Sequence, residues 1–339
     1  MKTYYRPIAQ TDAARPADAL TLAGGWCWFT HVEVLRRGEA ALVVPADEIP
    51  TGDVAQLCAP RSPICDLEMD HPHLMGILNV TPDSFSDGGQ FVGVAAAVRQ
   101  AEVMHAAGAS LIDVGGESTR PGADFVPVAE EITRTAPAIR EISSKLDVPI
   151  SIDTRKSEVA RQALSEGASL VNDVSGFTYD PHLASVAKDA NVPVCVMHAQ
   201  GDPATMQKNP TYDDVLLDVY DFLDTQVERL KSLGVARDQI VVDPGIGFGK
   251  TLTHNLALLA RLSLFHGLGC PILLGASRKK FIGAIGEASL VQERMPGSVA
   301  VALEGVAQGA QIVRVHDVAE TRQALNLWQA VTTGDYNGA

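Results

Sequence analysis

A unit of helix, glycine and short strand occurs three times in the chain with nearly the same sequence. The copies read Gly108-Ala-Ser-Leu-Ile-Asp-Val, Gly167-Ala-Ser-Leu-Val-Asn-Asp and Gly309-Ala-Gln-Ile-Val-Arg-Val. Ala-rich stretches with helical spacing, such as 94–107 and 156–166, precede the glycine, which suits the left-handed position just past a helix. The apolar pair that follows starts a short strand ending on a polar residue. Such repeats predict a fold built from alternating strands and helices.

Five more short apolar runs extend the same rhythm. Together the eight predicted strands occupy 74–81, 111–116, 149–154, 170–175, 193–198, 240–244, 271–277 and 311–316. Their composition suits parallel strands that are buried on both faces. Helical segments separate them, the longest over about 213–233. Eight units in about 260 residues match the size of a (β/α)8 TIM barrel. A doubly wound open sheet, which usually has fewer strands, is the alternative.

Residues 1–73 do not follow this rhythm and form a predicted N-terminal extension, while 74–335 form the barrel. Two apolar runs flank Arg36-Arg37-Gly38-Glu39 and could form a β-hairpin. The Pro-rich stretch 45–72 is predicted to be an extended linker. The extension is too short for a second enzyme, so we expect it to pack against the barrel.

Charge and cysteine content exclude several classes of protein. The formal net charge of −14 argues against a nucleic-acid surface, and any anionic substrate then requires a local cluster of cationic side chains. The five cysteines have no C-x-x-C spacing, which indicates reduced thiols and a cytoplasmic location. We expect no signal peptide and no membrane partner, because no apolar run approaches the length of a membrane span.

Polar residues occur at the carboxyl ends of the predicted strands, where a barrel of this kind carries its active site. These residues are Asn79, Asp113, Asp153, Asn172, Met197 with His198, Asp243, Ser277-Arg278-Lys279, and Arg314 with His316. A single Asp or Asn at such an end is often only a loop cap. A convergent set of this size is poorly explained by capping.

The residue types indicate the chemistry of the ligands. Asp153, Asn172 and Asp243 offer acceptors and one amide, which suit a flat heterocycle with several N–H groups and ring nitrogens. A second group, made of Lys279, Arg314 and His316, suits phosphate or carboxylate groups. The side chain of Asn79, with Asp113 nearby, could ligate Mg²⁺, which takes few protein oxygens and prefers those of phosphates.

Two long loops follow the first two strands and are rich in Gly, Ser and Pro. They read Thr81-Pro-Asp-Ser-Phe-Ser-Asp-Gly-Gly and Gly115-Gly-Glu-Ser-Thr-Arg-Pro-Gly-Ala. Loops of this kind can act as lids that exclude water, although ordinary surface loops have a similar composition.

Two other motifs carry less weight. The stretch Asp243-Pro-Gly-Ile-Gly-Phe-Gly-Lys-Thr fails the phosphate-loop pattern, because Pro244 stands where the first glycine is required. Its glycines instead permit a sharp turn that brings the backbone and Phe248 close to a flat ligand. The pair His71 and His73 could bind a metal, but a pair at this spacing is usually solvated.

The motifs together closely resemble those of the dihydropteroate synthase family. They run in family order over about 74–330 and begin with two long, specific stretches, Met75-Gly-Ile-Leu-Asn-Val-Thr-Pro-Asp-Ser-Phe-Ser-Asp-Gly-Gly and Asp113-Val-Gly-Gly-Glu-Ser-Thr-Arg-Pro-Gly. The others are Ile152-Asp-Thr, Asn172-Asp, Met197-His, Asp243-Pro-Gly-Ile-Gly-Phe-Gly-Lys, Ser277-Arg-Lys and Arg314-Val-His-Asp.

The resemblance implies a step of folate biosynthesis. A transferase of this family condenses 6-hydroxymethyl-7,8-dihydropterin pyrophosphate with p-aminobenzoate and releases 7,8-dihydropteroate and pyrophosphate. Pyrophosphate is expected to leave first, and the arylamine then attacks a pterin methylene cation. The resemblance also implies Mg²⁺ as cofactor, a homodimer and sensitivity to sulfonamides.

Site roles transfer by matching motifs. The predicted pterin set is Asp153, Asn172, Met197, Asp243, Phe248, Lys279 and Arg314. The predicted pyrophosphate set is Asn79, Arg314 and His316, with the metal on Asn79. The predicted p-aminobenzoate set is Phe85, Thr119, Arg120, Pro121 and Ser277. Among all of these, Asp153, Lys279, Arg314 and His316 are the expected catalytic residues.

Two alternatives remain at this point. A pterin-binding methyltransferase barrel also holds a pterin with Asp and Asn at strand ends, but it has no pyrophosphate to expel. A non-catalytic pterin-binding paralogue is the other, although the retained charged residues argue against it.

Overall fold

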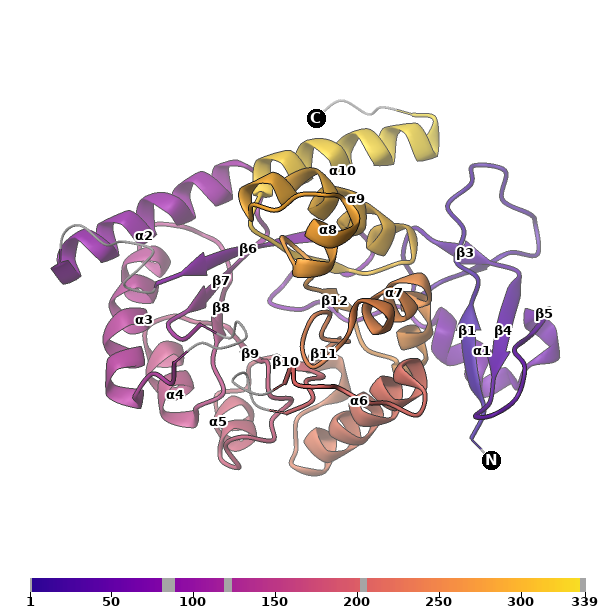
Figure 1. The fold of residues 1–339 in the computed structure, drawn as a ribbon, viewed down its shortest axis with the longest axis horizontal. Helices are drawn as coiled ribbons and strands as arrows, with labels where there is room; N and C mark the ends of the chain where they lie inside the picture. The colour runs from indigo at the N-terminus through magenta and orange to yellow at the C-terminus, as the bar shows by residue number, and fades with distance from the viewer. Residues whose placement is uncertain (1, 81–88, 119–123, 202–205, 336–339) are drawn as a thin grey trace.

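The computed structural model describes residues 2–80, 89–118, 124–201 and 206–335, and they form a closed parallel barrel with a small N-terminal sheet beside it (Figure 1). The barrel sheet has eight strands in the order β11-β10-β9-β8-β7-β6-β13-β12. They are β6 (His73–Asn79), β7 (Leu111–Gly115), β8 (Ile150–Asp153), β9 (Leu170–Asp173), β10 (Val194–Met197), β11 (Ile240–Asp243), β12 (Leu273–Leu274) and β13 (Ile312–Val315). A parallel bridge between Val242 and Ile272 joins β11 to β12 and closes the barrel. The predicted (β/α)8 fold is confirmed, and the open sheet is wrong.

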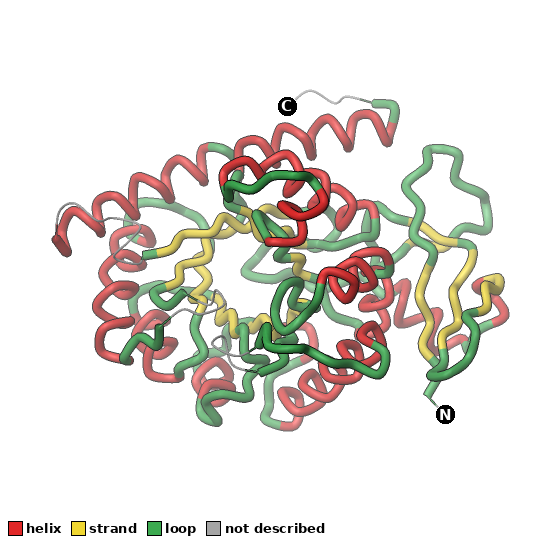
Figure 2. Tube along the Cα trace, in the orientation of Figure 1, coloured by secondary structure: helices red, strands yellow, loops and turns green. Residues whose placement is uncertain are grey.

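Helices alternate with the strands and surround them (Figure 2). They are α2 (Gly89–Ala106), α3 (Val128–Ser143), α4 (Ser157–Ser165), α5 (Leu183–Asp189), α6 (Val215–Ser232), α7 (Leu252–Ala260), α8 (Lys280–Ile285), α9 (Met295–Ala307) and α10 (Val318–Thr333). The three repeat glycines, Gly108, Gly167 and Gly309, have φ values of 96°, 110° and 87°. Each therefore adopts the left-handed conformation predicted for a residue just past a helix.

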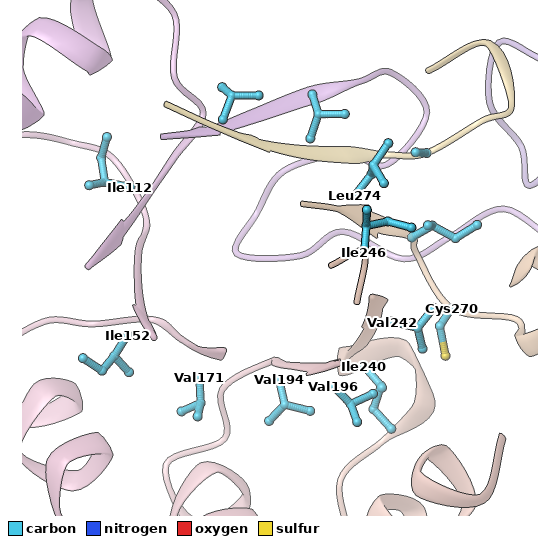
Figure 3. Close-up of a cluster of buried hydrophobic side chains, with 14 of the residues drawn as sticks. Ile112, Ile152, Val171, Val194, Val196, Ile240, Val242, Ile246, Cys270 and Leu274 are labelled. Atoms are coloured by element: carbon cyan, nitrogen blue, oxygen red, sulfur yellow. The ribbon is translucent and has the colours of Figure 1, made fainter. Parts of the chain in front are cut away.

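The strand residues alternate between the outside and the inside of the barrel, as the two-residue period of a strand requires. Outward side chains pack under the helices, and Figure 3 shows Ile112, Ile152 and Val171 in this layer. A separate cluster on the opposite parity contains the inward residues of the amino-terminal half of the strands, namely Met75, Leu111, Leu170, Cys195, Val241, Leu273 and Ile312. Because the parity is the same further along each strand, later inward positions carry polar strand-end residues, among them Asp113, Asn172, Asp243 and Arg314.

The segment before β6 closes the amino-terminal end of the barrel. Ile64 and Met69 are each only 1% exposed and belong to the same buried cluster as the lowest inward layer. The Cys65 thiol donates to the carbonyl of Ser169, which precedes β9. Residues of the predicted extension therefore fill the amino-terminal end of the barrel interior.

The rest of the extension is more regular than predicted. Its sheet has the order β1-β4-β5, made of Tyr4–Pro7, His31–Leu35 and Leu42–Pro45, and β2 (Leu20–Thr21) pairs with β3 (Trp28–Phe29). The antiparallel pair β4–β5 is the predicted hairpin. The prediction of an extended linker over 45–72 is wrong, because it contains the short helix η1 (Ala46–Glu48) and helix α1 (Thr51–Cys58). Pro45 and Pro50 directly precede the two helices. Because proline is well tolerated at a helix start, these prolines did not indicate an extended chain.

Ion pairs attach the extension to the barrel. Arg37 binds Asp218 at 2.6 Å and Asp221 at 2.7 Å, both on α6, and Lys2 binds Asp221 at 2.8 Å. Arg6 of the extension and Arg261, which follows α7, share Glu33 of β4. Within the described part of the chain, no helix is long and apolar enough to cross a membrane.

Candidate active site

The inward strand-end residues meet at the carboxyl end of the barrel. Strand register places Asn79 beside Gly115, Gly115 beside Asp153, and Asp153 beside Asn172. On the next pair of strands Met197 lies beside Asp243. The convergence predicted from the sequence therefore holds for the strand residues, because equivalent positions on parallel strands end at the same edge.

Arg314 joins two carboxylates from other strands. Its Nε lies 2.6 Å from Oδ2 of Asp113, and its Nη2 lies 2.9 Å from Oδ2 of Asp153. The amide of Asn172 donates to the same Oδ2 of Asp113 at 3.2 Å. Of these carboxylates, Asp113 is fully buried and Asp153 is 5% exposed. A single guanidinium thus joins carboxylates on two strands, β7 and β8, and Asn172 on β9 donates to one of them.

The two carboxylates retain unused acceptors. The second oxygen, Oδ1, of both Asp113 and Asp153 is buried and has no hydrogen-bond partner. Burial raises the pKa of Asp153, and Asp113 adds to this effect, although Arg314 opposes it. Because a buried unpaired acceptor is costly, such oxygens indicate a ligand that donates hydrogen bonds.

Asp243 shapes the turn that follows β11. Its Oδ1 accepts from the backbone N–H of Gly245 at 2.7 Å. Gly245 has a φ of +68°, and a Cβ there would lie 1.9 Å from the carbonyl oxygen of His198. Only glycine fits this close approach, as the sequence predicted for a sharp turn in this motif.

Lys279 and Phe248 meet across this turn. Nζ of Lys279 lies 3.9 Å from the centre of the Phe248 ring, within the range of a cation–π contact. Burial lowers the pKa of Lys279, and the nearby Asp243 carboxylate opposes that shift. The side chain thus lies near both the aromatic wall and the Asp243 acceptor.

Lys250 is a structural residue to which the sequence analysis gave no role. It is 3% exposed, and its Nζ contacts Nδ1 of His198 at 2.8 Å and the carbonyls of Gly245 and Phe248 at 2.9 and 3.0 Å. Burial lowers the pKa of Lys250. It holds the turn that carries Phe248. The position of Lys250 at the end of the glycine-rich motif was the sequence feature from which this role could have been predicted.

Ser277 and His316 lie together although they were assigned to different substrates. The Ser277 hydroxyl lies 3.0 Å from Nδ1 of His316 and accepts from the His316 backbone N–H at 3.2 Å. Ser277 follows β12 and His316 follows β13. The pair therefore lies where the predicted p-aminobenzoate and pyrophosphate sets adjoin.

Asn79 is half-buried at the end of β6. A Cβ built on Gly115 would lie 3.7 Å from Oδ1 of Asn79 and 3.7 Å from Oδ2 of Asp153. Across the described ranges, no cluster of three or more His, Cys, Asp or Glu side chains could hold a metal, and His71 and His73 contact Asp70 and Glu68 instead.

The remaining predicted residues, Phe85, Thr119, Arg120 and Pro121, lie outside the described residues.

A model of the pterin binding enzyme family matches residues 75–316, and the chain belongs to this family. The matched region covers every strand of the barrel and begins within β6. The family is the one in which the strand-end carboxylates, the asparagine and the buried arginine were expected.

Relatives with known names are similar over most of the chain. Dihydropteroate synthase of Escherichia coli (strain K12) is 46% identical over 271 residues, which are 80% of this chain and 95% of that protein. A solved structure of the Xanthomonas albilineans dihydropteroate synthase with 4-aminobenzoic acid is 43% identical, with a TM-score of 0.75 over 80% of this chain and 98% of that one. The Yersinia pestis enzyme, solved with a sulfonamide drug complex, is 44% identical, with a TM-score of 0.74 over 78% and 96% of the two chains.

Proposed function

We propose a division of roles among these residues for the synthesis of dihydropteroate, the transferase reaction that this chain catalyses in folate biosynthesis. The chain joins 6-hydroxymethyl-7,8-dihydropterin pyrophosphate to p-aminobenzoate. The observation that carries the assignment is the unpartnered, buried Oδ1 of Asp153, whose other oxygen binds Arg314.

The pterin occupies the carboxyl end of the barrel. Its ring N–H groups donate to Asp153 and Asp243, and Asn172 offers both a donor and an acceptor. Met197 and Phe248 line the flat faces, with the stem of Arg314 against the ring. Lys279, which lies over Phe248, donates to a ring acceptor. Each ligand group then finds a partner on a barrel strand or on the turn that follows one.

Bond breaking precedes bond making in this scheme. The C–O bond of the substrate breaks, and pyrophosphate leaves with the electron pair. Carboxylates around the pterin stabilise the methylene cation, while Arg314 and His316 bind the departing anion. The amine lone pair of p-aminobenzoate then forms the new C–N bond, and the nitrogen releases a proton.

Mg²⁺ fits beside Asn79 and, when bound, neutralises charge on the pyrophosphate oxygens. Asn79, at the end of β6, and His316, directly after β13, orient the pyrophosphate. Ser277, which contacts His316, adjoins the p-aminobenzoate region, where Phe85, Thr119, Arg120 and Pro121 complete the set.

A pyrophosphate-release assay tests this function. Release should require both substrates for sustained turnover, and dihydropteroate should appear in equal amount. Methyl transfer without pyrophosphate release would support the methyltransferase alternative. Pterin binding with no product from any substrate pair would support a non-catalytic paralogue.

We also propose that the chain forms a homodimer and works in the cytoplasm. The five cysteines are free thiols, which agrees with a reducing compartment. Light scattering of the purified chain and cell fractionation test these two points separately.

A further inference from the structure

Arg278 has an unfavourable backbone conformation between two residues of the candidate site. Its φ is +57°, in the left-handed region that residues with a Cβ normally avoid. Ser277 precedes it and Lys279 follows it, and both have a place in the scheme above, whereas Arg278 has none. Residues in such conformations persist where the surrounding contacts fix them, and they concentrate at functional sites. The contacts of Arg278 show what fixes it.

The start of α9 and the residue before it hold both backbone polar groups of Arg278. Its N–H donates to the hydroxyl of Ser298 at 2.8 Å, and its carbonyl accepts from Nη1 of Arg294 at 3.2 Å. Ser298 is 4% exposed, and its hydroxyl donates to the carbonyl of Arg294 at 2.7 Å. These three residues form a closed ring of hydrogen bonds, which stabilises the left-handed conformation.

The side chain of Arg278 binds the carboxylate of Asp317 with two hydrogen bonds. Nε lies 2.9 Å from Oδ2, and Nη2 donates to Oδ1. Asp317 directly precedes α10, where an Asp commonly caps a helix, but its side chain makes no cap hydrogen bond. The carboxylate binds Arg278 instead. A bidentate pair of this kind fixes the relative position of its two residues more strictly than a single contact does.

This ion pair joins the loops that follow β12 and β13. Ser277 directly precedes Arg278, and His316 directly precedes Asp317. The Ser277 hydroxyl contacts Nδ1 of His316 at 3.0 Å and accepts from its backbone N–H at 3.2 Å. The ion pair and the Ser277 contacts are therefore two adjacent links between the same two loops.

The Ser277 contacts also bear on the protonation of His316. Oγ of Ser277 accepts from the His316 backbone N–H, so its own proton can be donated to Nδ1. A neutral imidazole that accepts at Nδ1 carries its proton on Nε2, which is then a donor. A donor nitrogen suits an anion such as pyrophosphate. The orientation of the ring therefore depends on how the two loops are held.

We propose that Arg278 is a positioning residue for His316. It acts through Asp317 in one loop and through Ser277 in the other, and keeps the imidazole in the orientation that binds the departing pyrophosphate. The proposal rests on the role proposed above for His316. In this scheme Arg278 contacts no substrate.

The test compares four variants. Arg278→Asn removes the guanidinium but keeps a residue that tolerates the left-handed conformation. Asp317→Asn removes the charge of the partner, and the double variant combines both changes. Arg140→Asn is the matched control, because it breaks a bidentate pair with Glu166 at an exposed position on α3. Steady-state kinetics and thermal unfolding are measured for each. Imidazole ¹⁵N signals, assigned by their loss in His316→Gln, report the ring without any substrate.

We expect kcat to fall by at least about tenfold in both single variants, because small misplacements near a reacting group are costly. The KM for the pterin substrate should change less than about twofold, since Asp153, Asn172 and Asp243 still bind the ring. The double variant should be no slower than the slower single variant, because both changes break the same pair. The His316 signals should shift in all three, and Arg140→Asn should change neither the kinetics nor these signals.

Two kinetic outcomes would overturn the proposal. One is full activity of Asp317→Asn, and the other is a pair of losses that multiply in the double variant, because Arg278 would then act without Asp317. Unshifted His316 signals in a slow variant would also overturn it, since partial unfolding lowers kcat without changing the imidazole of the folded fraction.

The kinetics of His316→Gln distinguish this proposal from the role on which it rests. If His316→Gln turns over normally, the proposed role of His316 is wrong, and the positioning role falls with it. If His316→Gln is slow while the Arg278 and Asp317 variants are not, the role of His316 stands and only the positioning by Arg278 is refuted.

Discussion

The side chains of Asp153 and Arg314 form an ion pair of 2.9 Å across the mouth of the barrel. Asp153 ends β8 and Arg314 lies on β13, and two strands, β7 and β6, separate them in the sheet. No local sequence signal connects two residues at this separation. Their contact follows from the curvature of the sheet into a barrel, so the position of the proposed pterin acceptor Asp153 depends on strands that lie far apart in the sequence.

Replacing Asp153 with Asn should weaken binding of the pterin pyrophosphate by at least about tenfold. Asn keeps only one acceptor oxygen, so either Arg314 or the ring N–H would lose its partner, and a missing partner costs roughly 1–3 kcal/mol, of which 1.4 kcal/mol is a factor of ten. Calorimetric titration measures this. Asp147→Asn, at an exposed position before the other end of β8, is the control and should bind normally. Equal binding by both variants would contradict the assignment.

Removal of divalent cations should abolish turnover. In the proposed scheme Asn79 is the one protein ligand of Mg²⁺, and the pyrophosphate of the substrate supplies most of the other oxygens. Activity should return on addition of Mg²⁺, and the chain without substrate should bind the ion weakly. Full activity in excess chelator would remove the metal from the scheme.

An arylsulfonamide should inhibit competitively with p-aminobenzoate, because it has the same aniline ring and a polar sulfonyl in place of the carboxylate. Inhibition should be stronger when pyrophosphate and Mg²⁺ are present, as expected if the site is completed over the bound anion. Substitution of Phe85 or Pro121 should weaken the drug more than the substrate. Initial-rate kinetics decide the matter, and inhibition that p-aminobenzoate does not relieve would refute it.

Gly245→Ala should destabilise the protein more than Gly38→Ala does. Both glycines have positive φ, which costs another residue roughly 1–2 kcal/mol. Only at Gly245 would the added Cβ meet the His198 carbonyl oxygen, whereas nothing lies within 4 Å at Gly38. Chemical denaturation measures the difference, and equal losses would show that the turn can move away.

The stability of the protein should fall as the pH drops below about 6.5, and His266 should be one cause. Burial lowers the pKa of His266 to about 3, from an ordinary value of 6.5, so between these values the unfolded chain binds a proton that the folded chain does not. Each such proton costs roughly 1.4 kcal/mol per pH unit. His266→Gln should flatten the dependence of unfolding free energy on pH, whereas the exposed His105→Gln should not. Identical pH profiles for the two variants would contradict this.

The barrel was predictable because each strand and helix is indicated by a short stretch of its own sequence. Each of the eight predicted strands corresponds to an observed one, since short apolar runs between helices are unambiguous when they repeat. The ends of the strands were predicted less well. The run 271–277 contains only a two-residue strand, Leu273–Leu274, because the chain after this strand bends toward the candidate active site. Helix α1 was missed because prolines around it suggested an extended chain.

The members of the site were easier to predict than their pairings. Strand-end position alone identified Asp113, Asn172 and Arg314, but their mutual hydrogen bonds depend on the register of a closed barrel. Nothing in the sequence indicated that Lys156 and Glu131 form a buried ion pair. A lysine after a strand and a glutamate on a helix usually face water. Their contact arises only when α3 packs against the end of β8.

Ile64 and Met69, which fill the barrel from below, set a limit on where this chain can be shortened. A protein that began at residue 74 would lack these side chains, and the lowest inward layer, from Met75 to Ile312, would face water. The three-stranded sheet, by contrast, has its own small core and is attached to the outside of the barrel through ion pairs and through Tyr4. A protease cut or gene fusion upstream of Ile64 therefore leaves the amino-terminal end of the barrel filled. The same change at residue 74 removes Ile64 and Met69 and leaves that end open.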